Sequence, residues 1–121
     1  TSKNTTATLG NFVFQTPTCH GLIKWHAHPQ KCLDVKGASV ANGTNVQLWG
    51  CSNLMKFTVP QNGTGQWRWA AHPTKCLDVA GGKNHNGNTI QVWRCLDKPN
   101  PNQQFEMLGN PGVIRWMNSN K

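Results

Sequence analysis

Short runs in which apolar and polar residues alternate follow one another along the chain, and Gly, Pro or Asn-Gly turns separate them. The runs are rich in Val, Ile, Phe and Trp, whose branched or aromatic side chains suit the half-buried surface of a β-sheet. The separating residues favour tight turns. The pattern therefore predicts an all-β chain of short strands.

The longest of these patterns occurs twice. Residues 28–51 read HPQKCLDVKGASVANGTNVQLWGC and residues 72–95 read HPTKCLDVAGGKNHNGNTIQVWRC. A shift of 44 residues superimposes these pairs: His28 and His72, Pro29 and Pro73, Cys32 and Cys76, Asp34 and Asp78, Gly43 and Gly87, Gln47 and Gln91, Trp49 and Trp93, Cys51 and Cys95. A low-complexity tract would not keep this register, so the chain contains an internal repeat.

Two further runs occur three times each. One ends in Trp and follows a Gly (22–25, 66–69 and 113–116), and the other is centred on Phe (12–14, 57–59 and 105–107). A full unit thus has four strands, and three such units together close a common core that one unit cannot form alone. The repeats are residues 25–68, residues 69–115, and a short third made of 116–121 plus 1–24. We expect one domain, residues 1–121.

We expect the tryptophans that recur in all three units mainly in the barrel core or its cap, because residues that recur in every unit usually serve packing. These tryptophans are Trp25, Trp69 and Trp116. The net charge of +8 favours acidic partners, but the basic residues are scattered and predict no nucleic-acid-binding face. No apolar stretch approaches the roughly 18 residues of a membrane helix, so we expect no membrane insertion.

The cysteines indicate the compartment. Cys32 and Cys51 are separated by 19 residues, as are Cys76 and Cys95, in matching contexts. The repetition predicts two equivalent disulfides and an oxidising environment, hence a secreted, extracellular protein. Asn4, Asn42 and Asn62 each begin an Asn-x-Thr sequon, but chance produces this pattern often in a chain rich in Asn and Thr, so the prediction of secretion depends on the cysteines. Cys19 is left over, either free or bridged to another chain.

The segments CLDV, NGNTIQVWRC and NQQF occur in this order. They resemble the sequence motifs of the ricin B-type lectin family, carbohydrate-binding proteins with a Gln-x-Trp motif. The resemblance covers about residues 21–116. It implies a β-trefoil with pseudo-threefold repeats, the third split between the termini and incomplete. It also implies a shallow site for galactose or related sugars in a complete lobe.

The resemblance places the better site in the second repeat. There, Asp78 would accept hydrogen bonds from two sugar hydroxyls, Gln91 would brace that carboxylate, and Trp93 would stack on the ring. Asn102 would reach the outer hydroxyls. The remaining implied members are Gln103, from the Gln-x-Trp motif, and His85, from the loop beside the pocket.

The first repeat departs from the family pattern. It keeps Asp34 and Trp49, but Leu54 and Met55 stand where Asn and Gln would be. We therefore expect a weaker second site there, and none in the third repeat, which lacks the Asp strand.

Physical chemistry supports a sugar site of this composition. A carboxylate makes strong charge-assisted hydrogen bonds with hydroxyls, an indole face covers C–H groups, and an amide both donates and accepts. In the structural alternative, Asp34 and Asp78 cap turns, and Trp49 and Trp93 fill the core. For the second repeat the complete set favours binding, and for the first the structural alternative is favoured.

Other functions are weaker predictions. The two repeated aspartates belong to different lobes, so no carboxylate pair for acid–base catalysis is evident, and we expect no enzyme. His26 and His28 lack a carboxylate or thiolate at matching spacing, so we expect no metal and no cofactor. Three alternatives to a free-standing lectin stay open. In the first, the chain is an accessory module or subunit of a glycoside hydrolase or toxin. In the second, it is a trefoil that has lost sugar binding and contacts proteins, and in the third it binds nucleic acid or sulfated glycans. Glycans or glycoproteins, a partner subunit and a second copy are the expected partners.

Overall fold

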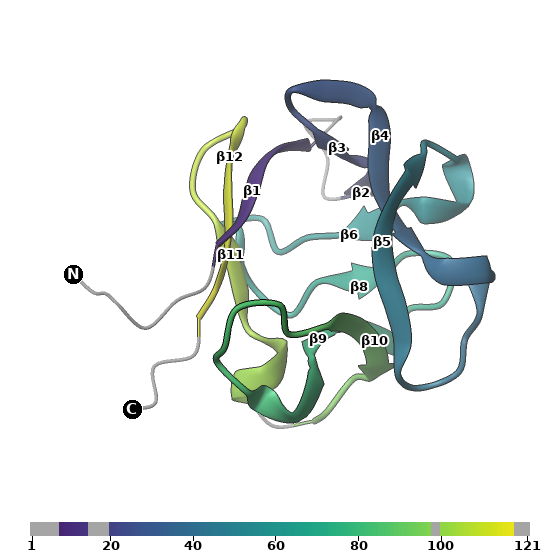
Figure 1. Cartoon of the computed structure of the whole chain (residues 1–121), viewed down its shortest axis with the longest axis vertical. Coiled ribbons are helices and arrows are strands. Elements are labelled where there is room, and N and C mark those ends of the chain that lie inside the picture. Colours follow the sequence, from purple (N-terminus) through teal and green to yellow (C-terminus); the bar gives the residue numbers. More distant parts are fainter. Residues whose placement is uncertain (1–7, 15–19, 98–99, 118–121) are drawn as a thin grey trace.

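The computed structural model describes residues 8–14, 20–97 and 100–117, which form short strands joined by turns and four single-turn 3₁₀ helices (Figure 1). The strands are β1 (Thr8–Phe14), β2 (His20–Gly21), β3 (Ile23–Trp25), β4 (His28–Val35), β5 (Thr44–Gly50), β6 (Phe57–Thr58), β7 (Thr64–Gly65), β8 (Arg68–Trp69), β9 (Lys75–Val79), β10 (Ile90–Arg94), β11 (Phe105–Met107) and β12 (Gly112–Trp116). The 3₁₀ helices are η1 (Lys36–Ala38), η2 (Asn53–Met55), η3 (Ala80–Gly82) and η4 (Pro101–Gln103). The predicted all-β class is confirmed.

The pairing of the strands closes a barrel. β2 and β3 are parts of one strand interrupted at Leu22, and β7 and β8 are parts of another. All pairs are antiparallel: β6 joins β2 to β8, β11 joins β7 to β12, and β1 joins β12 to β3. Following these pairs around the described residues returns to the starting strand, so the tryptophan and phenylalanine strands form a closed ring, which removes open sheet edges.

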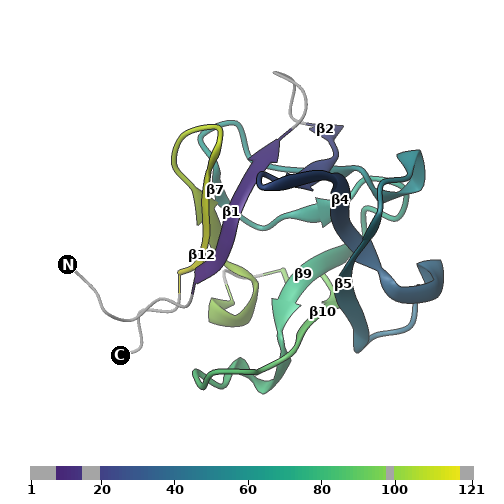
Figure 2. The same ribbon diagram turned by 45° about the horizontal axis from the view of Figure 1, so that its top comes forward.

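Two hairpins extend from this ring. β4 pairs with β5, β9 pairs with β10, and β5 pairs with β10, so the hairpins of the first and second repeats contact each other (Figure 2). β12 and β1 lie side by side although they come from opposite ends of the chain, so the two ends together complete the barrel (Figure 1). The part of the chain that the structure describes shows no third hairpin beside those of the first and second repeats.

Equivalent positions of the three repeats fill the barrel. Ile23, Trp67 and Ile114 each precede the recurring tryptophan by two residues, and each is at most 1% exposed. The recurring Trp69 and Trp116 are also buried, as predicted, and their indole N–H groups donate to the carbonyls of Leu54 and Pro101. The pseudo-threefold pattern of the sequence is thus a pattern of core packing.

Trp25 is half-buried at the edge of this core and contacts the ring of His28, with 4.4 Å between ring centroids. Trp69 and His72 repeat the contact at 4.6 Å. The recurrence of histidine at these two positions therefore reflects packing against a tryptophan edge.

Both predicted disulfides are confirmed. Cys32 is bonded to Cys51 and Cys76 to Cys95, with Cα–Cα distances of 5.0 and 5.1 Å. Each one joins the first strand of a hairpin to the residue that follows its second strand. Cys19 lies outside the described residues. Among the described residues, no helix has the length and apolarity needed to span a membrane.

Candidate functional site

The second hairpin brings together the side chains on which the predicted site depends. In the register of β9 and β10, Asp78 lies opposite Gln91, and Cys76 lies opposite Trp93. Directly opposed residues of an antiparallel pair project to the same face, and so do residues two apart in one strand. Asp78, Gln91 and Trp93 therefore share one face of the hairpin.

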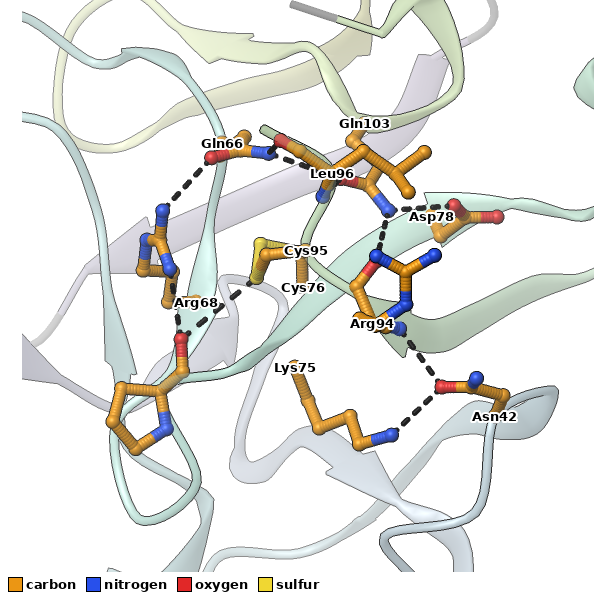
Figure 3. Close-up of a disulfide and its surroundings, with 11 residues drawn as sticks. Asn42, Gln66, Arg68, Lys75, Cys76, Asp78, Arg94, Cys95, Leu96 and Gln103 are labelled. Atoms are coloured by element: carbon orange, nitrogen blue, oxygen red, sulfur yellow. Dashed lines mark hydrogen bonds between the residues drawn. A yellow bond between two sulfur atoms is a disulfide. The ribbon is translucent and has the colours of Figure 1, made fainter. Parts of the chain in front are cut away.

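The carboxylate of Asp78 is held by two amides. Gln91 Nε2 donates to Oδ1 at 2.9 Å, and Gln103 Nε2 donates to Oδ2 at 3.0 Å (Figure 3 shows the second bond). Asp78 is only 3% exposed, and burial raises the pKa of its carboxyl group, while the two amide bonds lower it in part. A carboxylate oxygen can accept about two hydrogen bonds. Each oxygen thus keeps acceptor capacity beyond the bond that fixes it.

Gln103 holds this carboxylate from behind. Its Nε2 also donates to the carbonyl of Arg94 at 2.9 Å, and its Oε1 accepts from Gln66 Nε2 at 3.0 Å and from the Leu96 N–H at 3.1 Å (Figure 3). The two donors and two acceptor sites of the amide are all used, and the residue is fully buried. The geometry makes Gln103 a brace that orients Asp78 from inside the protein.

Asn102 approaches from the short helix η4. The side chain of Asn100 caps this helix by accepting from the Asn102 N–H at 2.9 Å, and Pro101 occupies its first position. The Asn102 side chain is half-buried and lies against the backbone of Gly82 in η3. The strand and turn pattern of the sequence does not predict these 3₁₀ helices, although Asn before Pro is a recognisable turn signal.

Trp93 is 37% exposed, and Trp49 of the first repeat is 62% exposed. The alternative in which these tryptophans fill the core is therefore wrong. The alternative in which the aspartates cap turns also finds no support, because the carboxylate bonds of Asp34 and Asp78 are to glutamine amides. The Trp93 indole lies beside Gly43 in the turn of the first hairpin.

That turn ties the two hairpins together. Asn42 Oδ1 accepts from the Arg94 N–H at 2.8 Å and from Lys75 Nζ at 2.7 Å (Figure 3). In the sequence, Asn42 stands out only as the first residue of an Asn-x-Thr sequon. Its Asn-Gly dipeptide indicated a turn, but nothing in the sequence indicated what the turn contacts.

His85 lies in the loop between η3 and β10. It is exposed, and its Nδ1 lies 3.1 Å from the carbonyl oxygen of Asn86. Asn88 closes the loop by donating to the carbonyls of Ala80 and Lys83. The described contacts of His85 stay within its loop, so the structure does not bring it together with Asp78.

The first repeat has the same framework with different side chains. Gln47 Nε2 donates to Asp34 Oδ1 at 3.2 Å, but Met55 occupies the place of Gln103, and its sulfur accepts from the Val35 N–H. Ser52 caps η2 as Asn100 caps η4, which places Leu54 at the position of Asn102. Leu54 is 59% exposed. Asp34 thus has one amide brace where Asp78 has two.

Within residues 8–14, 20–97 and 100–117, no three His, Cys, Asp or Glu side chains gather where they could hold a metal ion. What the second repeat brings together is instead a braced carboxylate, a half-exposed indole and a side-chain amide. On a closed barrel with pseudo-threefold repeats, two of which carry a hairpin among the described residues, this combination defines the class of β-trefoil carbohydrate-binding modules.

Comparison with protein-family models agrees with this class. Residues 16–121 match the ricin-type beta-trefoil lectin domain, and the chain belongs to this family. A search of curated proteins found no match. Carbohydrate binding is the activity that this domain implies.

Proposed function

We propose that this protein is a lectin that binds a galactose-type sugar at the second repeat, through Asp78, Trp93 and Asn102. The observation that carries the proposal is the carboxylate of Asp78, which is nearly buried, held by two glutamine amides and placed on the same face as a half-exposed indole. Gln91 and Gln103 act through Asp78. We assign no direct sugar contact to His85.

The chemistry of the three groups suits a galactose-type sugar. Such a sugar has an axial hydroxyl beside an equatorial one, and a patch of C–H groups on one ring face. The remaining acceptor capacity of Asp78 suits two adjacent O–H donors, and the indole of Trp93 suits the C–H patch. Asn102 can donate to or accept from a further hydroxyl.

The proposed lectin acts outside the cell. Two disulfides and the family fold support a secreted, extracellular protein that acts by binding and not by catalysis. One shallow site gives weak binding, so avidity would come from a second copy, a partner subunit or a larger glycoside hydrolase or toxin that carries this module. The rival function, protein contact without sugar binding, is favoured by the exposed Trp49 and Leu54 of the first repeat.

A glycan array of three proteins tests the proposal: the wild type, Asp78→Ala and Asp34→Ala. The two substitutions are matched, because each removes the same side chain from equivalent positions of the two repeats. We expect the wild type and Asp34→Ala to bind galactose-terminated glycans, and Asp78→Ala to lose binding while remaining folded by circular dichroism. A wild type that binds no glycan would favour the protein-contact function, and binding retained by Asp78→Ala would show that the site is elsewhere.

A further inference from the structure

The short helices η1 and η3 follow the aspartate strands of the two repeats and differ at their last residue. Gly82 ends η3 with a φ of +65°, and Ala38 ends η1 with a φ of +53°. The repeat shift of 44 residues places these two positions in correspondence. The backbone conformation is therefore the same in both repeats, but only the second has glycine there.

The neighbour of Gly82 explains the difference. A Cβ atom added to Gly82 would overlap Oδ1 of Asn102 and come within 3.1 Å of its Cγ. Ala38 shows that the fold accommodates an alanine with this backbone conformation, so φ alone does not require glycine at position 82. The remaining reason for glycine is the space that the Asn102 amide occupies.

We propose that Gly82 is a positioning residue of the sugar site: its missing side chain lets Asn102 place its amide beside the carboxylate strand. Gly82 and Asn102 then act as a pair, and the pair Ala38 and Leu54 replaces both members in the first repeat. This proposal rests on the function proposed above. It adds that the absence of a side chain at position 82 determines whether the lobe can form the hydrogen bond from Asn102 to a further sugar hydroxyl.

Gly81 provides a matched control. Its φ is +63°, nearly the same as that of Gly82, so we expect a similar backbone penalty for alanine at either position. The three atoms nearest to a Cβ at Gly81 would belong to the Lys83 side chain, at 3.7 Å or more, which is ordinary van der Waals contact. The difference between Gly81→Ala and Gly82→Ala therefore isolates the overlap with Asn102.

The first measurement is lactose affinity by isothermal titration calorimetry. We expect Gly82→Ala to weaken lactose binding about tenfold, the loss that one side-chain hydrogen bond accounts for. Gly81→Ala should bind as the wild type does. Asn102→Ala should show the same loss, and Gly82→Ala with Asn102→Ala should lose no more than either single variant, because the two residues form one interaction. Equal affinity of Gly82→Ala and Gly81→Ala would overturn the proposal.

Stability separates a positioning role from a structural one. The Asn102 side chain can swing away from an alanine at position 82, so the two glycine variants should have similar thermal midpoints although only one loses lactose affinity. A midpoint much lower for Gly82→Ala than for Gly81→Ala would show that glycine serves folding, and would overturn the proposal.

The side-chain amide of Asn102 gives a readout without sugar. In ¹⁵N-labelled protein, its NH₂ signals are identified by their absence in Asn102→Ala. We expect them to shift in Gly82→Ala and to stay in place in Gly81→Ala. If the wild type fails to bind lactose or any arrayed glycan, the proposed function fails, and this spectrum still decides the pairing: signals unmoved in Gly82→Ala would overturn it.

Discussion

Replacing Gln103 with Met tests how the carboxylate of Asp78 is held. Methionine is close to glutamine in size and occupies the equivalent place in the first repeat, so the change removes hydrogen bonds without leaving a large cavity. Four interactions of the Gln103 amide are lost, those with Asp78, Gln66, the Arg94 carbonyl and the Leu96 N–H.

The four losses do not have equal weight. Arg94 is exposed, so its carbonyl can bond to water instead, and Gln66 Nε2 keeps its bond to the Leu96 carbonyl. The carboxylate oxygen of Asp78 and the Leu96 N–H are less able to find a new partner. An unsatisfied group of this kind costs about 1–3 kcal/mol, and the greater hydrophobicity of methionine offsets part of that cost. We expect a net loss of about 2–4 kcal/mol in the free energy of unfolding.

Thermal and urea unfolding under non-reducing conditions, followed by tryptophan fluorescence, measures this loss. It corresponds to a fall of roughly 10 °C in the thermal midpoint of a domain of this size. Gln61→Met is the control, because Gln61 is exposed, and it should change stability by less than about 0.5 kcal/mol. A loss below about 1 kcal/mol for Gln103→Met would refute the view that this amide is an essential brace.

Two further predictions concern the sites. Burial raises the pKa of Asp78 above 3.8, so the native state binds this proton more tightly than the unfolded state; the contribution of Asp78 to stability therefore decreases as the pH rises through the raised pKa. At the proposed site the ionised carboxylate is the form that accepts from sugar hydroxyls, so lactose affinity should weaken as the pH falls through the same pKa, and calorimetry that finds unchanged affinity down to pH 3.8 would contradict this role. Converting the first repeat with Ala38→Gly, Leu54→Asn and Met55→Gln should raise the calorimetric stoichiometry for lactose from one site towards two, whereas Leu54→Asn alone should not; an unchanged stoichiometry in the triple variant would show that further differences between the lobes matter.

The repeats, the strands and the disulfides were predictable because each leaves a local pattern in the sequence. The register of 44 residues carries Cys32 onto Cys76 and Asp34 onto Asp78, and the structure reproduces this equivalence in strand pairing. The contact between Asp78 and Gln91 followed from the resemblance to the lectin family and not from spacing alone. Directly opposed strand residues then place the two side chains within hydrogen-bonding distance.

The roles of Gln103 and Gly82 could not be predicted from the sequence. The sequence marks Gln103 as a motif residue, but only its burial and its four hydrogen bonds distinguish a brace from a sugar ligand. Gly82 stands beside Gly81 in a turn where either glycine could be needed for a positive φ. Only the position of Asn102, a residue twenty positions later, distinguishes them, and no local pattern encodes such an approach.

The second strands of the two hairpins differ in the exposure of equivalent side chains and in strand pairing. The repeat shift places Leu48 in correspondence with Val92, yet Leu48 is 40% exposed and Val92 is fully buried. Val92 belongs to the buried core cluster, and its strand β10 also pairs with β5 of the preceding repeat, where Val92 lies opposite Thr44. In the described part of the chain no strand of the third repeat pairs with β5 in the corresponding way.

The tryptophans of the two lobes also differ in exposure. Trp93 is less exposed than Trp49, and the turn of the first hairpin lies beside Trp93 through Gly43. The Asn42 side chain anchors this turn on the second hairpin through the Arg94 N–H and Lys75. The proposed second-repeat site therefore draws on two repeats: its own strands supply the carboxylate and the indole, and the preceding repeat supplies the turn that lies beside the indole. A complete set of residues in the first repeat would still lack that turn among the described residues, which is a physical reason to expect weaker binding there even after its side chains are restored.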